Sequence, residues 1–236
     1  MEIFKTKIKI KLTAIVSLVL FIITIIVLVL FLNTEDNDKI GTILGSVCAG
    51  LIVALIQFFI SWQDYKQTEK LRELELIEVL YDRDDRTFYE NYIKKSKRKI
   101  SMMGVTGGRF FKDFADDSQN ATSNAKVLIE ALNRGVIVRI LLPELDFVDE
   151  NKKNDVKTVI EQAGKIKEKF PNHFEIKHFK HVPAHSIFCI DDKCIVGPVF
   201  PELESKYTPA LYLHNSSPIA DRYLKYFENE WGKAID

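Results

Sequence analysis

The stretch Thr13–Leu32, TAIVSLVLFIITIIVLVLFL, carries no charge and consists almost wholly of leucine, isoleucine, valine and phenylalanine. A helix needs about 20 apolar residues to cross the hydrocarbon core of a bilayer. The run ends in Phe31, Leu32 and Asn33, without the small residues of a signal-peptide cleavage site. The sequence therefore predicts a transmembrane helix that is retained in the mature protein.

A second apolar run, Ile40–Trp62, follows a short acidic link at residues 33–39. It is less apolar than the first because it contains Thr42, Ser46, Gln57 and Ser61, and Trp62 lies where an aromatic belt forms at a membrane surface. We expect residues 1–63 to form a hairpin with spans at about 13–32 and 40–62.

Basic residues flank the hairpin on both outer sides. They are Lys5, Lys7, Lys9, Lys11, Lys66, Lys70 and Arg72. Because positive charge is retained on the cytosolic side of a membrane, both termini and all that follows the hairpin are expected in the cytosol. This predicts a two-span protein of the inner or plasma membrane.

Small residues recur every four positions along the second span. One stripe holds Gly41, Gly45 and Ala49, and a neighbouring stripe holds Ser46, Gly50 and Ala54. Such stripes let two helix backbones approach closely. They predict either the interface of a homo-oligomer, a dimer or tetramer in which Gln57 could line a pore, or packing of the second span on the first. Both interpretations stay open.

Composition restricts the soluble part. Lysine plus arginine (33) balances aspartate plus glutamate (33), which excludes nonspecific binding to nucleic acid or acidic lipid through net charge. Any anion must bind at a local site. The three cysteines are an odd, sparse set typical of a reducing compartment. We interpret Cys189 and Cys194 as small apolar strand residues in preference to a redox pair or half a metal site, and expect neither metal nor cofactor.

After the hairpin, residues 64–98 are predicted to be a helical connector. A helix is expected from Asp64 to about Asp82, where Leu71, Leu74 and Leu80 lie near helical spacing, either as a short coiled coil or docked on the soluble domain. A second helix is expected from Arg86 to about Lys97. The basic cluster at residues 94–99 is interpreted as its solvated end.

From Lys99 onward, short apolar runs alternate with helical patterns. Strands are expected at residues 100–105, 136–142, 174–179, 185–190, 193–196 and 210–214, and helices at 123–134, 154–169 and 218–233. This alternation predicts an α/β domain with a mixed sheet over residues 99–236.

Two segments of this domain resemble the phospholipase D superfamily. They are Asn133–Pro143, NRGVIVRILLP, and His185–Gly197, HSIFCIDDKCIVG. The resemblance implies a phospholipase D-like half-domain, in a family whose enzymes bring two such halves together. In those enzymes the motif histidine attacks phosphorus and motif lysines hold the phosphate oxygens. If this chain is an enzyme, the resemblance assigns catalysis to His185 and Asp192.

The sequence departs from that family at the lysine. Two residues after His185 stands Ile187, which cannot hold a phosphate, and Gly197 is followed by Pro198 where the family has serine. Lys180 and Lys193 are the nearest substitutes. Phosphoryl transfer depends largely on cations that stabilise the negative charge of the phosphate in the transition state. Because the motif lysine is missing, we expect no catalytic residues in this chain.

Loss of catalysis need not remove ligand binding. In this fold strand ends converge on a phosphate site, and backbone amides at helix starts bind phosphate. The expected ligand-binding residues are Thr106, Gly107, Gly108, Arg109, His185, His214, Asn215 and Ser216, with an ordinary turn at 106–108 and a helix cap at 214–216 as the alternatives.

The leading hypothesis combines these features. The architecture resembles the membrane effectors of bacterial anti-phage systems. In such a system the soluble domain would bind a phosphodiester ligand, a nucleotide or short oligonucleotide made by a companion nucleotidyltransferase. The bound ligand would control an oligomeric assembly of the hairpins in membrane lipid and lead to growth arrest. The second hypothesis is a membrane-tethered dimeric phosphodiesterase, a nuclease or phospholipase, that uses His185. The third is an assembly scaffold for another protein.

Overall fold

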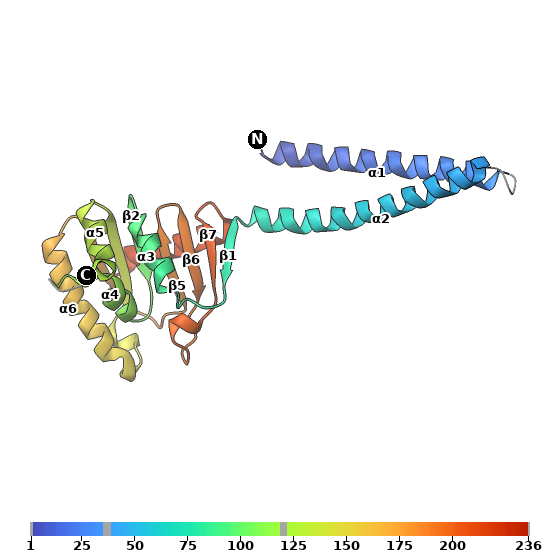
Figure 1. Ribbon diagram of the computed structural model, residues 1–236. Coiled ribbons are helices and arrows are strands. Elements are labelled where there is room, and N and C mark those ends of the chain that lie inside the picture. The colour runs from blue at the N-terminus through green and yellow to red at the C-terminus, as the bar shows by residue number, and fades with distance from the viewer. Residues whose placement is uncertain (1, 35–38, 119–121, 236) are drawn as a thin grey trace. The chain divides into compact units, whose positions relative to one another are not determined.

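A computed structural model of the chain describes residues 2–34, 39–118 and 122–235. The chain divides into two compact units, one up to Lys70 and one from Leu71 onward. The first holds two long helices and the second holds all of the β-structure (Figure 1).

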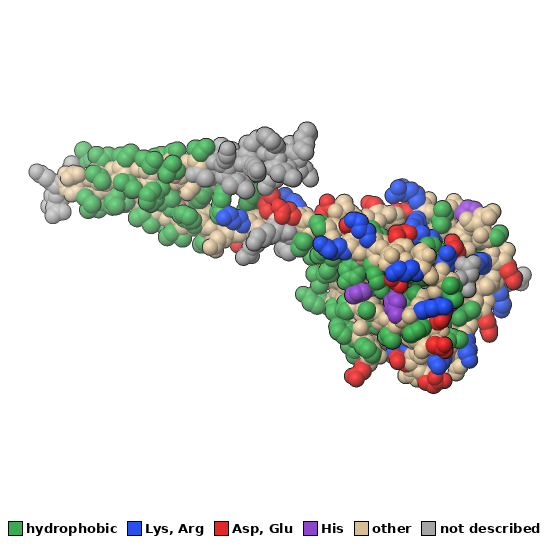
Figure 2. All heavy atoms as spheres, turned by 180° about the vertical axis from the view of Figure 1, so that it is seen from behind, with side chains coloured by type: hydrophobic (Ala, Val, Ile, Leu, Met, Phe, Trp, Pro, Cys, Tyr) green, Lys and Arg blue, Asp and Glu red, His purple; other side chains and the backbone are tan. Residues whose placement is uncertain are grey.

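The first unit consists of α1 (Glu2–Leu32) and most of α2 (Lys39–Glu73). Both helices are long and apolar enough to cross a membrane, over Ile15–Leu32 with a mean hydropathy of 3.5 and over Lys39–Lys66 with 2.5. Figure 2 shows hydrophobic side chains over much of the coloured part of these helices on the face in view. Residues 35–38 of the acidic link lie outside the described part of the chain.

The two stripes of small residues on α2 have different surroundings. A Cβ added to Gly45 would lie 3.0 Å from the ring of Phe31 on α1, whereas a Cβ added to Gly50 would meet nothing within 4 Å. Cys48, one turn from Gly45, is buried, and Ala49 is exposed. The side of α2 that carries Gly45 therefore packs within the hairpin, and the side that carries Gly50 is open.

The second unit is an α/β domain with a mixed, seven-stranded sheet in the order β1-β7-β6-β5-β2-β3-β4. The strands are β1 (Leu76–Leu80), β2 (Lys99–Met103), β3 (Ile137–Pro143), β4 (Phe174–Phe179), β5 (His185–Ile190), β6 (Lys193–Pro198) and β7 (Ala210–His214). Neighbouring strands run parallel from β2 through β3 to β4 and antiparallel elsewhere. The predicted fold class is confirmed.

Helices cover both faces of this sheet (Figure 1). One face packs against α3 (Arg86–Lys94), α4 (Gly108–Phe114), α5 (Val127–Asn133) and α6 (Lys153–Lys169), and the other against α7 (Pro218–Lys233). Short 3-10 turns lie at Ser123–Lys126, Leu145–Phe147, Glu150–Lys152 and Ser205–Tyr207. Because strand side chains alternate between faces, each strand contributes to two cores.

The connector differs from its prediction. The helix ends at Glu73 instead of near Asp82, and Leu76–Leu80 forms β1 at the edge of the sheet. Glu75 has a φ of 49°, which no helix continues through. The leucine and isoleucine spacing in this segment fits a helix and a strand equally, and pairing with β7 decides the outcome.

Candidate functional site

The β5–β6 hairpin carries the residues that resemble the phospholipase D motif. His185 lies at the start of β5 on the face covered by α7, where its ring meets Tyr223 and Tyr226 edge-on at centroid distances of 5.3 and 5.5 Å. Its Nδ1 is buried and has no hydrogen-bond partner among the described residues. The half-buried imidazole thus lies against two tyrosine rings.

The position of the motif lysine is part of the hydrophobic core. Ile187 is fully buried under α7. Neither predicted substitute reaches His185: Lys180 pairs with Glu144 at 3.5 Å, and Lys193 opposes Ile190 at the far end of the hairpin, whereas His185 opposes Pro198. No lysine of this hairpin therefore takes the place of the missing one.

The turn of the hairpin is anchored by Asp191. Its carboxylate accepts hydrogen bonds from the backbone N–H groups of Lys97, Arg98 and Lys99 at 2.8, 2.8 and 3.0 Å. Burial alone raises the pKa of Asp191, but these three bonds and the charge of Arg98 outweigh it and lower the pKa. Asp192, which stands at the motif spacing, has an exposed side chain. The carboxylate that holds the hairpin to β2 is therefore that of Asp191.

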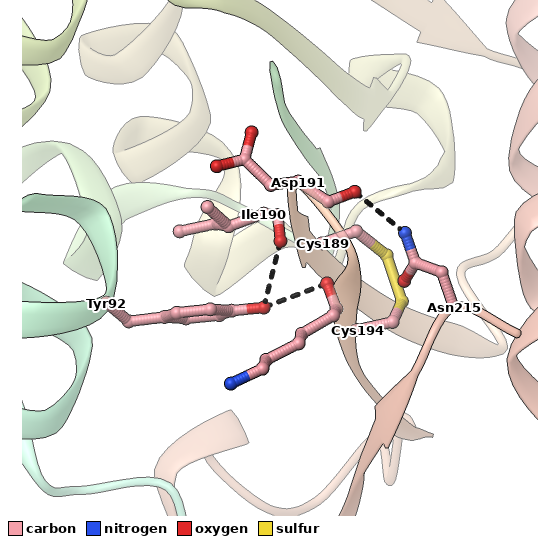
Figure 3. Close-up of a disulfide and its surroundings, with 7 residues drawn as sticks. Tyr92, Cys189, Ile190, Asp191, Cys194 and Asn215 are labelled. Carbon is pink, nitrogen blue, oxygen red and sulfur yellow. Dashed lines mark hydrogen bonds between the residues drawn. A yellow bond between two sulfur atoms is a disulfide. The ribbon is translucent and has the colours of Figure 1, made fainter. Parts of the chain in front are cut away.

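Cys189 and Cys194 form a disulfide across the hairpin (Figure 3). The prediction of two unpaired apolar residues is wrong. The two cysteines are directly opposite each other in the antiparallel pair, so both side chains point to the face under α7. The count and spacing of the cysteines favoured a reducing compartment, but the register of the strands brings these two together.

The predicted ligand-binding residues lie at opposite ends of the sheet. Thr106, Gly107, Gly108 and Arg109 follow the end of β2, where Met103 pairs with Ile187, close to the start of β5. The segment 214–216 follows β7, where His214 pairs with Lys193 beside the hairpin turn. The structure brings residues 106–109 to the end of the sheet that holds His185, and leaves His214, Asn215 and Ser216 at the other end.

Residues 106–109 are largely engaged within the protein. Gly107 has a φ of 69°, a backbone conformation that favours glycine, and Thr106 Oγ1 accepts the N–H of Gly108 at 3.2 Å. The guanidinium of Arg109 donates to the carbonyls of Arg83 and Asp84 at 3.1 and 3.0 Å and pairs with the Asp84 carboxylate at 2.8 Å. Arg109 thus fastens the connection between β1 and α3.

Arg83 is a buried residue at this end that the sequence patterns did not single out. Its guanidinium donates to the carbonyl of Ser205 at 2.9 Å, to Ser186 Oγ at 2.8 Å and to Thr208 Oγ1. Burial lowers its pKa and raises the pKa of nearby Tyr89 to about 12. Arg83 lies in a loop between β1 and α3, where no periodic pattern marks a buried position.

Residues 214–216 join the hairpin turn to the start of α7. Asn215 donates from its side chain to the carbonyl of Asp191 at 3.0 Å and from its backbone to that of Asp192 at 2.8 Å (Figure 3 shows the first bond). Ser216 donates to the carboxylate of Glu75. The helix cap itself is Ser217, whose hydroxyl accepts the N–H of Ile219.

Arg139 and His181 both have partners on α7. Arg139 lies under this helix, 4.5 Å from the ring centre of Trp231, and pairs with Glu228. Burial raises the pKa of Glu228, but hydrogen bonds from Arg139 and Lys99 outweigh it and lower that pKa. His181 contacts Glu230 at 2.9 Å.

No protein-family model and no curated protein matches this sequence. Similar solved structures include that of TrmBL2, an archaeal chromatin protein, with 15% sequence identity and a TM-score of 0.44. The match covers 79% of this chain and 69% of TrmBL2. Two others match 67% of this chain: Nuc from Salmonella typhimurium, a phospholipase D family member (17% identity, TM-score 0.43, 95% of that chain covered), and NucT from Helicobacter pylori (12%, 0.43, 96%). Likenesses of this degree carry no conclusion about ligand or activity.

Proposed function

We propose that this chain is a membrane effector whose soluble domain binds a nucleotide or short oligonucleotide without cleaving it, and thereby controls an assembly of hairpins in the membrane. One observation carries the non-catalytic part of the proposal. The motif position that would hold a phosphate is Ile187, which is fully buried in the core. A domain that keeps the motif hairpin without its lysine retains the fold of the site. It lacks the positive charge that would hold the phosphate oxygens during phosphoryl transfer.

The membrane part of the proposal rests on α1 and α2. Their apolar lengths suit two spans, and the flanking lysines favour cytosolic placement of both termini and of the domain in the plasma membrane. The open side of α2 at Gly50 offers room for a second copy of the chain, a dimer or tetramer. The biological role that fits is growth arrest in bacterial anti-phage defence, with a companion nucleotidyltransferase as the source of the ligand.

The first experiment separates binding from turnover. Full-length protein in detergent is incubated with nucleotides, short DNA oligomers, phospholipid and bis-p-nitrophenyl phosphate, and both affinity and hydrolysis are measured. Nucleotide or oligonucleotide binding without hydrolysis is expected, and mass analysis of what co-purifies would identify the natural ligand. Hydrolysis that His185→Ala abolishes would overturn the proposal.

That last outcome would establish the second candidate, a membrane-tethered dimeric phosphodiesterase. One observation favours it: the buried Nδ1 of His185 has no hydrogen-bond partner among the described residues, so the ring is not locked into a structural role by that atom. In this candidate, His185 of two chains would supply the nucleophile and the general acid.

The second experiment tests the membrane half of the proposal. Gly50→Ile fills the open side of α2, whereas Ala49→Ile is a matched change at a neighbouring exposed position on the other small-residue stripe. If copies meet at Gly50, Gly50→Ile abolishes growth arrest and oligomers in detergent while nucleotide binding persists. Equal activity of both variants and the parent would reduce the hairpin to an anchor.

A further inference from the structure

A cavity of about 280 Å³ opens at the end of the sheet opposite to His185, between α3 and the turn of the β5–β6 hairpin. Three aromatic residues form its apolar wall: Phe88 and Tyr92 from α3 and Tyr212 from β7. Their rings pack against one another at centroid distances of 5.5 to 5.9 Å. The wall is therefore a fixed aromatic surface rather than a set of mobile side chains.

The rim of the cavity is polar and uncommitted. Asn91 and Lys95 extend from α3, and Asp192 and Lys193 from the hairpin turn. Within the described part of the chain, none of these four side chains forms a hydrogen bond or an ion pair. Tyr212 is only 8% exposed and Lys193 Nζ lies 5.8 Å over its ring, so the rings that reach the surface of the cavity are those of the half-buried Phe88 and Tyr92.

The backbone around this rim is held firmly. Tyr92 donates its hydroxyl to the carbonyl of Lys193 at 2.8 Å (Figure 3). The Asp191 carboxylate accepts three backbone N–H groups at and just before the start of β2. These bonds fix the turn relative to α3, so the four rim side chains project from a rigid frame. Preorganisation of this kind reduces the entropy lost when a ligand binds.

We propose that this cavity binds one nucleoside phosphate unit, either a free mononucleotide or the end of a short oligonucleotide. The base packs against the half-buried rings of Phe88 and Tyr92, the phosphate is held by Lys95 and Lys193, and Asn91 and Asp192 hydrogen-bond to the edge of the base. Contact of a base with aromatic rings together with lysine contacts is the general basis of single-stranded nucleic-acid recognition. The volume lies near the lower limit of small-ligand pockets, which suits one nucleotide unit.

The inference takes the class of ligand from the proposed function, but it places the binding site at the end of the sheet opposite to His185. The polar groups near His185 are mostly bonded to the protein itself, whereas those around this cavity are free. Asp191 also lines the cavity, but its carboxylate is taken up by three backbone N–H groups. The remaining charges at the rim are those of two lysines and one aspartate, which favours an anion.

The test measures the affinity of full-length protein in detergent for each mononucleotide and for oligothymidines of two to six residues. Lys95→Gln with Lys193→Gln is expected to weaken binding at least about 10-fold and to reduce its salt dependence. Phe88→Leu, which removes a half-buried ring of the wall, is expected to weaken binding by about 10-fold. Lys97→Gln with Arg98→Gln is the control, because it also removes two positive charges at the same end of the sheet but outside the cavity.

The two proposals fail in different ways. Unchanged affinity in the double lysine variant, combined with loss of binding in His185→Ala, would overturn the site inferred here and leave the proposed function standing. Absence of binding to every nucleotide and oligomer would overturn both. The lysine variants change side chains outside the hydrophobic core, so they test the site even if Phe88→Leu fails to fold. Binding of mononucleotides identifies a free ligand, and binding of oligomers alone identifies a strand end.

Discussion

The two ends of the sheet in the soluble domain use their polar side chains differently. At the end that holds His185, the guanidinium groups of Arg83 and Arg109 donate to carbonyls and hydroxyls of the protein. At the other end, Asp191 anchors the hairpin turn, while the side chains of Asn91, Lys95, Asp192 and Lys193 around the adjacent cavity form no hydrogen bond or ion pair within the described part of the chain. The comparison teaches that the motif-like residues and most of the unpaired polar side chains lie at different ends of this sheet.

Removal of the Asp191 carboxylate should have the largest effect on folding. Asp191→Ala leaves three backbone N–H groups without their acceptor and should lower the free energy of unfolding by about 3 kcal/mol, given the partial exposure of the site. The measurement is urea unfolding in detergent, followed by Trp231 fluorescence in a Trp62→Phe background. Asp192→Ala is the control and should change stability by less than about 0.5 kcal/mol. Equal effects would show that Asp191 does not anchor the turn.

At the opposite end, Arg83→Met should be destabilising by about 2 kcal/mol, because three acceptors, among them the buried Thr208, lose their donor. The loss is smaller than for Asp191 because the change also removes a buried charge with its desolvation penalty. Lys206→Met, at a residue next to the same loop, controls for removal of a charge. A neutral Arg83→Met would indicate that this end is less tightly bonded than its contacts imply.

Reduction of the Cys189–Cys194 disulfide, or Cys189→Ala with Cys194→Ala, should cost about 2 kcal/mol of stability, since the closed loop is short. The comparison of oxidised and reduced protein by the same unfolding measurement gives this value directly. Cys48→Ala serves as the control for loss of a thiol. If the reduced protein is as stable as the oxidised one, the hydrogen bonds of Asp191 alone hold the turn.

The smallest expected effect is on pH dependence. The folded-state pKa of Asp191 is lowered, so its stabilisation is complete above the unfolded pKa of about 3.9 and is lost as the pH falls through the folded value. We expect about 1 kcal/mol of acid destabilisation below pH 4 in the parent that Asp191→Asn lacks. Identical pH profiles of the two proteins would contradict the lowered pKa.

Much of the fold was predictable because its signals are local. The strands Phe174–Phe179 and Ala210–His214 and the helix Pro218–Lys233 match the predicted ranges, since each has a clear period and terminal residues that stop it. β1 was predicted as a helix because its apolar spacing fits both periods. Strand pairing, a contact between distant segments, resolved that ambiguity.

The candidate site was less predictable. Residues 106–109 and His185 were expected to share one end of the sheet with residues 214–216, but β5 and β7 run parallel, so the start of one and the end of the other lie at opposite ends. The cavity beside Asp191 combines residues from α3, the hairpin turn and β7, which no sequence spacing relates.

The sequence by itself determined the two apolar helices, the charge pattern around them, the α/β class and the motif-like hairpin with Ile187 in place of lysine. These depend on composition and short-range periodicity, which a single chain displays directly. Only the tertiary structure decided which stripe of α2 packs within the hairpin, that Cys189 pairs with Cys194, and which polar groups stay free. Those outcomes depend on register and burial, which arise when residues far apart in the chain compete for the same neighbours.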